Sequence, residues 1–439
     1  MVRTAARVTI DTLLALPGIA LLLAGALLAI VRGRPGPGER PRLLWGTTPL
    51  KSLTYMSRAL AEGGYKSDTV VTELYPIVER ADFDHHLHVS ARGAGLAHVG
   101  YTVKAYLFLA SALSRYDVFH YFFDGGVLRH AGLRRLELPL LRLLGKRVVL
   151  MPYGSDTWIL DRVPDLSWRH ALAIEYGELG NRAAAIERRV RRLTSQADVV
   201  VGCLVHATCL PRWDVLPLTC YPIDTGRLRP VPPRTEGPIR IAHAANHRGA
   251  KGTEFLVAAV ERLRAEGTDL ELTLIEKRPN QEALELIAAA DIYVDQLVFA
   301  YALAALEGMA LGKVVVSALE DTPAYQVFRR YSYLGECPIV PATVDTIERV
   351  LRELIARRSE WPAIGRRSRA YVERRHSPSA CRELFEAIYG RIWHGEQVDL
   401  INLYHPLRGA RQAPSTGSSD AQRAPGERRG APPARSGSR

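Results

Sequence analysis

The sequence has few cysteines and lacks several motifs that mark common enzyme classes. No two of its five cysteines form a Cys-x-x-Cys pair; they are Cys203, Cys209, Cys220, Cys337 and Cys381. An odd, sparse set of this kind is not a disulfide framework, so we expect reduced structural thiols and a cytosolic body. The chain also has no P-loop, no serine-nucleophile elbow and no internal repeat. Its composition excludes a collagenous, coiled-coil or wholly disordered protein.

Positive charge is in excess, but most of it lies near the two ends of the chain. The net charge is +12 over 439 residues. Residues 1–42 account for +4 of it and residues 405–439 for +5, which leaves +3 on the rest. A nucleic-acid-binding domain needs a basic face on its folded part. The near-balanced body therefore argues against nucleic acid as a partner.

A long uncharged stretch lies near the N-terminus. It runs for 20 residues from Thr12 to Val31 and is flanked by arginines on both sides. As a helix it is long enough to cross the hydrocarbon core of a bilayer, which is about 30 Å thick. We expect a retained membrane anchor over residues 1–34, with a cleaved signal or an interfacial helix as alternatives. Arginine is denser after the stretch than before it, so the body is expected on the cytoplasmic side of the cell membrane.

Two segments have the composition of chain outside a fold. Residues 34–42 form a Pro/Gly-rich linker, which is stiff enough to hold the body away from a bilayer. Residues 409–439 are rich in Pro, Gly, Ser and Arg and show no apolar period. We expect this C-terminal tail to be disordered.

Between the ends, short apolar runs alternate with amphipathic stretches. A length of 439 residues corresponds to roughly two or three domains. The predicted strands of the first half are at 42–48, 69–72, 118–123, 147–151 and 198–203. A proline-rich linker follows at 224–238. The alternation then begins again, with predicted strands at 239–243, 270–275, 292–295 and 314–317. Strands that alternate with helices indicate parallel sheets covered on both faces. We predict an α/β fold with two doubly wound, Rossmann-like domains that face a cleft.

The expected domain bounds follow from this rhythm. They are an N-terminal domain at 43–225, a C-terminal domain at 235–378, and a helix at 379–396. In open parallel sheets, ligands bind at the carboxyl ends of the strands, so the facing edges should line the site.

The most informative motif is the loop after the first strand of the second half. The stretch from Ile241 to Gly252 contains Arg248, Lys251 and two glycines, and a helix follows it. Two cations beside a helix N-terminus suit a diphosphate, because backbone N–H groups and side chains converge there. An ordinary solvated loop is the alternative interpretation.

The second motif is the helix and turn Ala305-Leu-Glu-Gly-Met-Ala-Leu-Gly-Lys313, which presents Glu307 before a buried strand. A carboxylate at this place can accept hydrogen bonds from both hydroxyls of a ribose; the alternative is that it stabilises the helix dipole. Together the two motifs resemble the sugar-nucleotide domain of the GT-B glycosyltransferases, specifically the retaining family 4 group, over roughly residues 43–396. The resemblance implies that Arg248 and Lys251 bind the donor diphosphate and stabilise the leaving group, and that Glu307 binds the ribose. It also implies that 43–225 is the acceptor-side domain, that 235–378 is the nucleotide-sugar-binding domain, and that the helix at 379–396 crosses back to the first domain.

The N-terminal half resembles the family more loosely. The stretch from Tyr116 to Gly126 is similar to a family strand that ends in a histidine facing the cleft, which would place His120 near the transferred sugar as a catalytic residue. A structural histidine is the alternative. Pro152-Tyr-Gly-Ser-Asp156 resembles a stretch that often reads His-Gly-Ser-Asp, with Tyr153 here in place of the histidine. The acceptor is expected to bind around Thr47, Thr48, Tyr153 and Asp156.

Two features depart from the family pattern. The position that commonly holds a second glutamate is Phe299, and glycines that let the donor phosphate approach are replaced by Ala300 and Ala302. A Cβ at those positions crowds the backbone N–H groups that would bind phosphate. The stretch from Asp82 to His88 contains an Asp-x-Asp beside histidines, but the fold that uses such a metal motif is not indicated. We therefore predict no metal and no cofactor.

The sequence thus predicts a hexosyltransferase. It would move a sugar from a nucleotide-diphosphate donor to a glycan or lipid-linked acceptor at the membrane, with retention at the anomeric carbon and without a metal. The departures leave open a catalytically silent GT-B-like protein that binds a sugar nucleotide. A nucleotide-sugar epimerase of the same fold is a further alternative.

Overall fold

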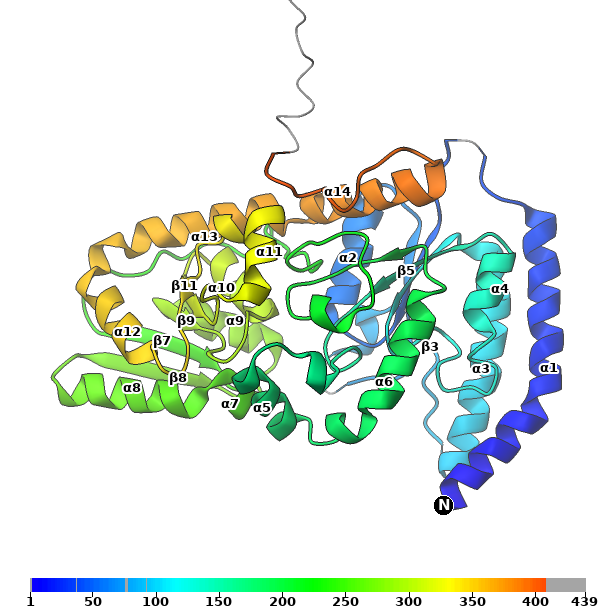
Figure 1. Cartoon of the computed structure of the whole chain (residues 1–439), viewed down its shortest axis with the longest axis horizontal. Helices are drawn as coiled ribbons and strands as arrows, with labels where there is room; N and C mark the ends of the chain where they lie inside the picture. The colour runs from blue at the N-terminus through cyan, green and yellow to red at the C-terminus, as the bar shows by residue number, and fades with distance from the viewer. Residues whose placement is uncertain (1, 37, 76–77, 92, 408–439) are drawn as a thin grey trace, which may run out of the picture. The chain divides into compact units, whose positions relative to one another are not determined.

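The computed structural model describes residues 2–407 except 37, 76–77 and 92 (Figure 1). The predicted tail at 409–439 lies outside the described residues. Two parallel sheets, each covered by helices, confirm the prediction of two Rossmann-like α/β domains.

The first sheet has the strand order β3-β2-β1-β4-β5-β6, with every pairing parallel. Its strands are β1 (Leu43–Thr47), β2 (Ser67–Val71), β3 (His85–His86), β4 (Val118–Phe122), β5 (Arg147–Met151) and β6 (Val199–Val200). The helices of this domain are α2 (Lys51–Glu62), α3 (Ala94–Arg115), α4 (Glu137–Leu143), α5 (Leu166–Glu175) and α6 (Leu179–Thr194). All five residues of β1 and of β4 are buried, because helices cover both faces of the sheet. The strand order reverses between β1 and β4, and this is where ligands of such sheets bind.

The second sheet has the order β11-β10-β9-β7-β8 and is also parallel. Its strands are β7 (Ile239–Ala244), β8 (Leu270–Ile275), β9 (Ile292–Val294), β10 (Val314–Ser317) and β11 (Val340–Pro341). The helices are α7 (Arg248–Lys251), α8 (Thr253–Ala265), α9 (Asn280–Ala289), α10 (Leu303–Ala310), α11 (Pro323–Tyr331), α12 (Ile347–Ala356) and α13 (Trp361–Arg375). The corresponding reversal lies between β7 and β9.

The helix after α13 returns the chain to the first domain. Helix α14 (Pro378–Tyr389), extended by a π-helical turn (Gly390–His394), packs against α2. Leu384, Phe385 and Ile388 belong to the same buried cluster as Leu43 and Trp45 of β1. One face of the first sheet is therefore completed by residues from the far end of the folded chain.

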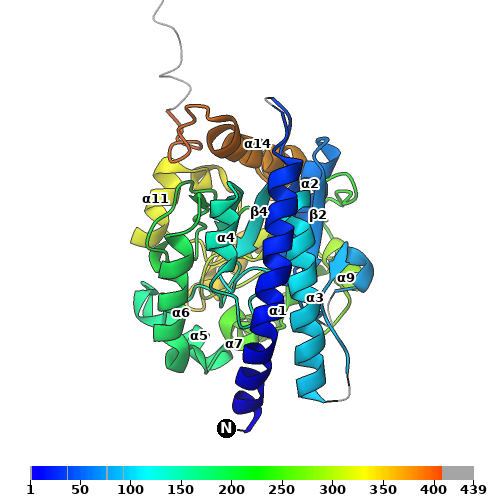
Figure 2. The same cartoon turned by 90° about the vertical axis from the view of Figure 1, so that its right-hand side faces the viewer.

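The uncharged N-terminal stretch forms helix α1 (Val2–Arg32), which lies along α3 (Figures 1 and 2). Both α1 and α3 are long and apolar enough to cross a membrane, by length and composition only. Half of the apolar window of α3 is buried inside the protein, compared with 28% for α1. Helix α3 is thus a core helix of the first domain, and α1 is packed on its outer side.

Candidate functional site

A buried ion pair spans the strand reversal of the second sheet. Lys251 ends α7, which follows β7, and Asp295 follows β9 directly. The Nζ of Lys251 donates to Oδ1 of Asp295 at 2.8 Å, with side-chain exposures of 11% and 0%. The second carboxylate oxygen of Asp295 accepts from the backbone N–H of Ala302, just before α10, at 2.6 Å. The chain thus brings a cation, a carboxylate and a helix N-terminus together at the edge where a ligand is expected.

Glu307 lies on α10, which begins beside Asp295. Its side chain is buried, and Nδ2 of Asn280 donates to its Oε1 at 3.2 Å. Burial raises the pKa of the Glu307 carboxyl to about 7; the Asn280 hydrogen bond opposes this, and the charge of Asp295 adds to it. The negative charge of Glu307 also contributes, after burial, to the raised pKa of Tyr55 on α2.

The two predicted diphosphate-binding cations point to different partners. Arg248 is exposed, and its Nε donates to Glu254 at 2.7 Å while a terminal nitrogen donates to Glu276 at 2.6 Å. These two carboxylates raise the pKa of the guanidinium. Lys251, by contrast, faces Asp295 in the interior. Each cation is neutralised by carboxylates of its own.

The backbone N–H groups of the same loop are occupied by a carboxylate from the first domain. Glu175, the last residue of α5, accepts from the backbone N–H of Gly249 at 2.9 Å and from that of Ala250 at 3.2 Å, both with Oε1. Its Oε2 lies 3.3 Å from Nδ1 of His247. The carboxylate thus takes the place at this loop where a phosphate oxygen was predicted. Sequence reasoning missed Glu175, because its role depends on the contact between α5 and α7.

The positions that depart from the family pattern are fixed by internal contacts. The ring of Phe299 stacks on Trp168 of α5, with centroids 4.9 Å apart and planes at 15°. Ala300 has a left-handed φ of 46°, which is unfavourable for a residue with a Cβ. Its backbone N–H donates to the hydroxyl of Tyr325 at 2.8 Å. In this structure the segment before α10 is therefore held by aromatic and hydrogen-bonding contacts.

A second polar cluster lies at the strand reversal of the first sheet. Arg129 has a buried side chain and forms ion pairs with Asp124, which follows β4, and with Glu73, which follows β2. It also donates to Oγ1 of Thr48 at 2.8 Å, and that hydroxyl donates to Asp124. The neighbouring hydroxyl of Thr47 donates to the carbonyl oxygen of Gly125 at 3.1 Å. Thr47 and Thr48 are fully buried, so in this structure they connect the loops after β1 and β4.

Tyr153 and Asp156 join the cluster from the loop after β5. The hydroxyl of Tyr153 donates to Asp124 at 3.4 Å. Asp156 is buried and accepts from the backbone N–H groups of Phe123, Tyr153 and Gly154. Burial, followed by the charge of Asp124, raises the pKa of Asp156 to about 7. The four predicted acceptor-side residues thus lie in one region. Asp156 holds the loops after β4 and β5 together through its hydrogen bonds to their backbone N–H groups.

Sequence reasoning missed three residues of this cluster, namely Glu73, Asp124 and Arg129. A usable signal existed for Asp124, which stands directly after a buried strand and before two glycines. No comparable local signal marks Arg129, because its two acidic partners come from different loops.

The prediction that His120 faces the cleft is wrong. The residue is fully buried on β4, and its ring stacks on Trp45 with centroids 3.7 Å apart. Its Nδ1 donates to the carbonyl oxygen of Leu44 at 3.2 Å, and its Nε2 accepts from the hydroxyl of Tyr389 at 2.9 Å. Burial lowers the pKa of His120 to about 3. Successive side chains of a strand point to opposite faces, and His120 points to the face that α14 covers. Its role is structural.

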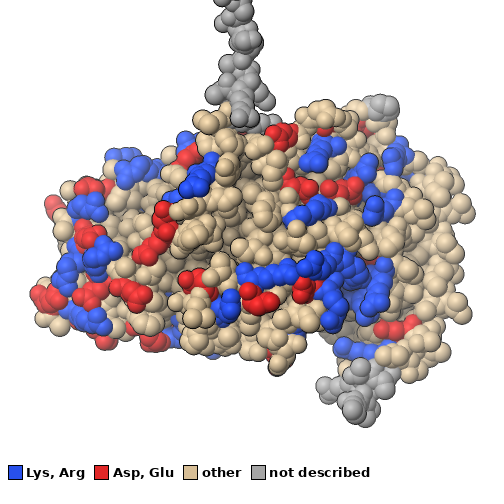
Figure 3. All heavy atoms as spheres, in the orientation of Figure 1, with Lys and Arg blue, Asp and Glu red and all other residues tan. Residues whose placement is uncertain are grey.

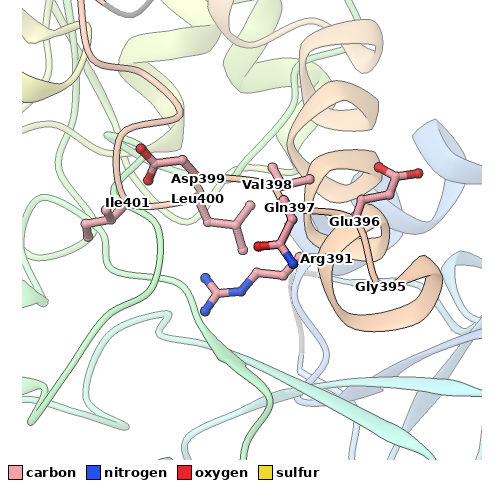
Figure 4. Close-up of a pocket in the computed structure, with 8 residues that line it drawn as sticks. All are labelled: Arg391, Gly395, Glu396, Gln397, Val398, Asp399, Leu400 and Ile401. Atoms are coloured by element: carbon pink, nitrogen blue, oxygen red, sulfur yellow. The ribbon is translucent and has the colours of Figure 1, made fainter.

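The Asp-x-Asp stretch is engaged in local contacts. Asp82 pairs with Lys51 at 2.6 Å, and Asp84 accepts from the backbone and side chain of Thr69 at 2.8 Å. Among the described residues, no group of three or more His, Cys, Asp or Glu side chains could hold a metal ion. A surface concavity of about 460 Å³ lies elsewhere, and Figure 4 shows that its lining comes from the single segment 391–401. It involves neither strand reversal.

Comparison with known proteins gives matches among solved structures only. No protein-family model and no curated protein matches the chain. Anabaena HepE in complex with UDP-glucose has 12% sequence identity and a TM-score of 0.49, over 80% of this chain and 100% of HepE. A glycosyltransferase from Rickettsia africae has 12% identity and a TM-score of 0.49, over 81% of this chain and 99% of that protein. At this identity the similarity concerns the fold.

Proposed function

We propose that the protein is a GT-B glycosyltransferase that binds a nucleotide-diphosphate sugar at the carboxyl edge of the second sheet. The observation that supports this most is the meeting of Lys251, the N-terminus of α10 and Glu307 around Asp295, at the strand reversal. A buried lysine beside backbone N–H groups suits a diphosphate, and a carboxylate one helical turn further suits the hydroxyls of a ribose.

The proposed chemistry needs the two cations of the loop after β7. The diphosphate would take the places of the carboxylates that now neutralise Arg248 and Lys251. Both cations would then stabilise the negative charge that develops on the leaving nucleotide diphosphate. We propose that this electrostatic stabilisation suffices without a metal, and that the sugar is transferred with retention at the anomeric carbon.

The acceptor would approach from the first sheet. Its carboxyl edge carries Thr47, Thr48, Tyr153 and Asp156 together with the ion pairs of Arg129. We propose a glycan or lipid-linked acceptor whose hydroxyls exchange hydrogen bonds with this cluster at the cell membrane, with the catalytic body on the cytoplasmic side.

Binding and turnover of a panel of UDP-, GDP- and TDP-linked sugars test the proposal. Arg248→Gln is a suitable variant, because Arg248 is exposed and its loss leaves the core intact. Arg262→Gln is the matched control, since Arg262 is exposed on α8 and also pairs with a glutamate. We expect Arg248→Gln to weaken binding of one donor by about tenfold, the loss of one charge-assisted contact, and the control to leave it unchanged. Failure of every sugar nucleotide to bind would overturn the proposal.

A second candidate is a catalytically silent protein of the same fold. The contacts that favour it are Glu175 on the amides of Gly249 and Ala250, and the stacking of Phe299 on Trp168. Both place protein groups where the donor phosphate would approach. Donor binding without transfer or hydrolysis would favour this candidate. Conversion of the donor sugar without an acceptor would instead indicate an epimerase.

A further inference from the structure

The inner face of α1 is part of the core of the first domain. Leu22, Ala26 and Ala29 are buried in the same cluster as residues of α3. At Gly25 a Cβ would collide with the backbone of Ala110, and at Gly18 it would collide with the ring of Tyr106. The two helices therefore approach as closely as only glycine permits. Such complementarity would be lost if α1 left the domain to cross a bilayer alone.

A polar contact also ties α1 to the domain. Asp11 accepts from Nε2 of His98 on α3 at 2.9 Å, and its side chain packs against Gly132 in the loop before α4. His98 is buried. A bilayer-spanning helix detached from α3 would bring Asp11 to the edge of the hydrocarbon without its partner, which is costly for a charged group. The pair thus favours the docked position of α1.

The outer face of α1 is apolar and uncovered. Five large side chains at helical spacing are each more than 60% exposed, namely Leu13, Leu16, Leu23, Leu27 and Ile30. Helix α3 adds Leu96 and Leu107, which are 66% and 51% exposed. Figure 2 shows α1 in front of the domain with α3 beside it. A contiguous apolar face of this kind marks an interaction surface.

Two exposed arginines lie in the segment that packs against α1. Arg134 and Arg135 follow the loop that packs on Asp11, and both are exposed. Arg192 on α6 is half-buried, and its pKa is lowered by burial and then by the positive charges of Arg135 and Arg134. In Figure 3 Lys and Arg gather over the region of α6, whereas few charges lie at the right-hand edge, where Figure 1 places α1.

We propose that α1 lies in the plane of an anionic bilayer rather than across it. Its outer face would enter the boundary between headgroups and acyl chains, and the exposed Arg134 and Arg135 would contact the headgroups. The charge beside the apolar face favours lipid over a second copy of the chain, because two copies would bring like charges together. This surface is independent of the donor site, so the inference stands apart from the proposed function.

Flotation of the full chain with lipid vesicles tests the surface. We expect co-flotation with vesicles that contain phosphatidylglycerol, and weaker binding to phosphatidylcholine alone. The double variant Leu16→Glu/Leu23→Glu should lower the vesicle-bound fraction by tenfold or more, because it puts two charges on the face that would enter the acyl chains. The matched control is Leu166→Glu/Phe255→Glu, at two exposed apolar residues of α5 and α8, which should bind as the unsubstituted chain does. Arg134→Gln/Arg135→Gln should remove most of the preference for the anionic lipid.

Side-specific labelling distinguishes the in-plane helix from a spanning one. Arg7→Cys and Arg34→Cys are introduced separately with Cys337→Ser, because the other four cysteines are buried. In sealed membrane vesicles from expressing cells, both positions should react with an impermeant maleimide from the same side. Reaction of only one position before detergent is added would show a spanning helix and overturn the inference. So would unchanged flotation of Leu16→Glu/Leu23→Glu, or a dimer that this double variant dissociates in the absence of lipid.

Discussion

Replacement of Glu175 by glutamine tests whether this side chain competes with the donor. The carboxylate occupies the backbone N–H groups of Gly249 and Ala250 and faces His247. If a nucleotide diphosphate binds at the same N–H groups, it must first displace Glu175. The glutamine variant keeps the size and an acceptor oxygen but removes the charge. We therefore expect the variant to bind nucleotide diphosphates more tightly.

The size of the effect follows from the contacts. A hydrogen bond to a charged group contributes about 1.5–3 kcal/mol, compared with about 0.5–1.5 kcal/mol for a neutral one. Glu175 accepts two such bonds, and its side chain is 17% exposed, while His247 is 52% exposed, so solvent weakens the pair. We estimate that removal of the charge weakens the contacts of residue 175 with these N–H groups by about 1–1.4 kcal/mol, which corresponds to about a five- to tenfold gain in nucleotide affinity.

Calorimetric titration of UDP and UDP-sugars into both chains provides the assay. Glu178→Gln is the control, because Glu178 is exposed and lies three residues after Glu175. Its substitution removes the same charge. The control separates local competition at the N–H groups from a general change in electrostatic potential. We expect the Glu178→Gln variant to bind the nucleotide with the affinity of the unsubstituted chain. Equal affinities of the Glu175→Gln variant and the unsubstituted chain would refute the reasoning, as would a gain that the control shares.

Three further predictions concern buried groups. Because the pKa of Glu307 is raised to about 7, nucleotide binding through its carboxylate should strengthen between about pH 6 and 8, and Glu307→Gln should flatten that profile in calorimetry. The pKa of His120 is lowered in the folded state, so its neutral form stabilises the protein above the unfolded pKa of about 6.5, and this stability is lost as the pH falls toward 3. In urea unfolding, His120→Gln should therefore weaken the acid dependence of stability without changing nucleotide affinity. A changed affinity would contradict a structural role. Lys251→Met leaves the buried charge of Asp295 without its cation and should lower the free energy of unfolding by about 3–5 kcal/mol. The double variant Lys251→Met/Asp295→Asn should recover part of that loss, and a single variant as stable as the unsubstituted chain would contradict the prediction.

The fold could be predicted because its signals are local. Apolar runs bounded by Gly and Pro predicted the strands, and their alternation with amphipathic stretches predicted the two parallel sheets. The orientation of His120 could not be predicted in this way. Both faces of β4 are buried, so the pattern of the strand does not say which side chain points where.

The candidate site was predictable in location but not in its pairings. Arg248, Lys251 and Glu307 lie near the carboxyl edge of the second sheet, as the rule for parallel sheets implies. Their partners come from elsewhere in the sequence, as with Glu276 for Arg248 and Asp295 for Lys251. Contacts between residues so far apart depend on how the elements pack, which no local pattern encodes.

The central claim is that the loop after β7 and the start of α10 form the nucleotide site. Amide hydrogen exchange with and without a saturating sugar nucleotide tests it most directly. We predict that protection increases in 241–252 and 300–311, and that Arg248→Gln needs about a tenfold higher nucleotide concentration to reach the same protection. A nucleotide that binds and protects other segments, while these two exchange as in the free protein, would contradict the account.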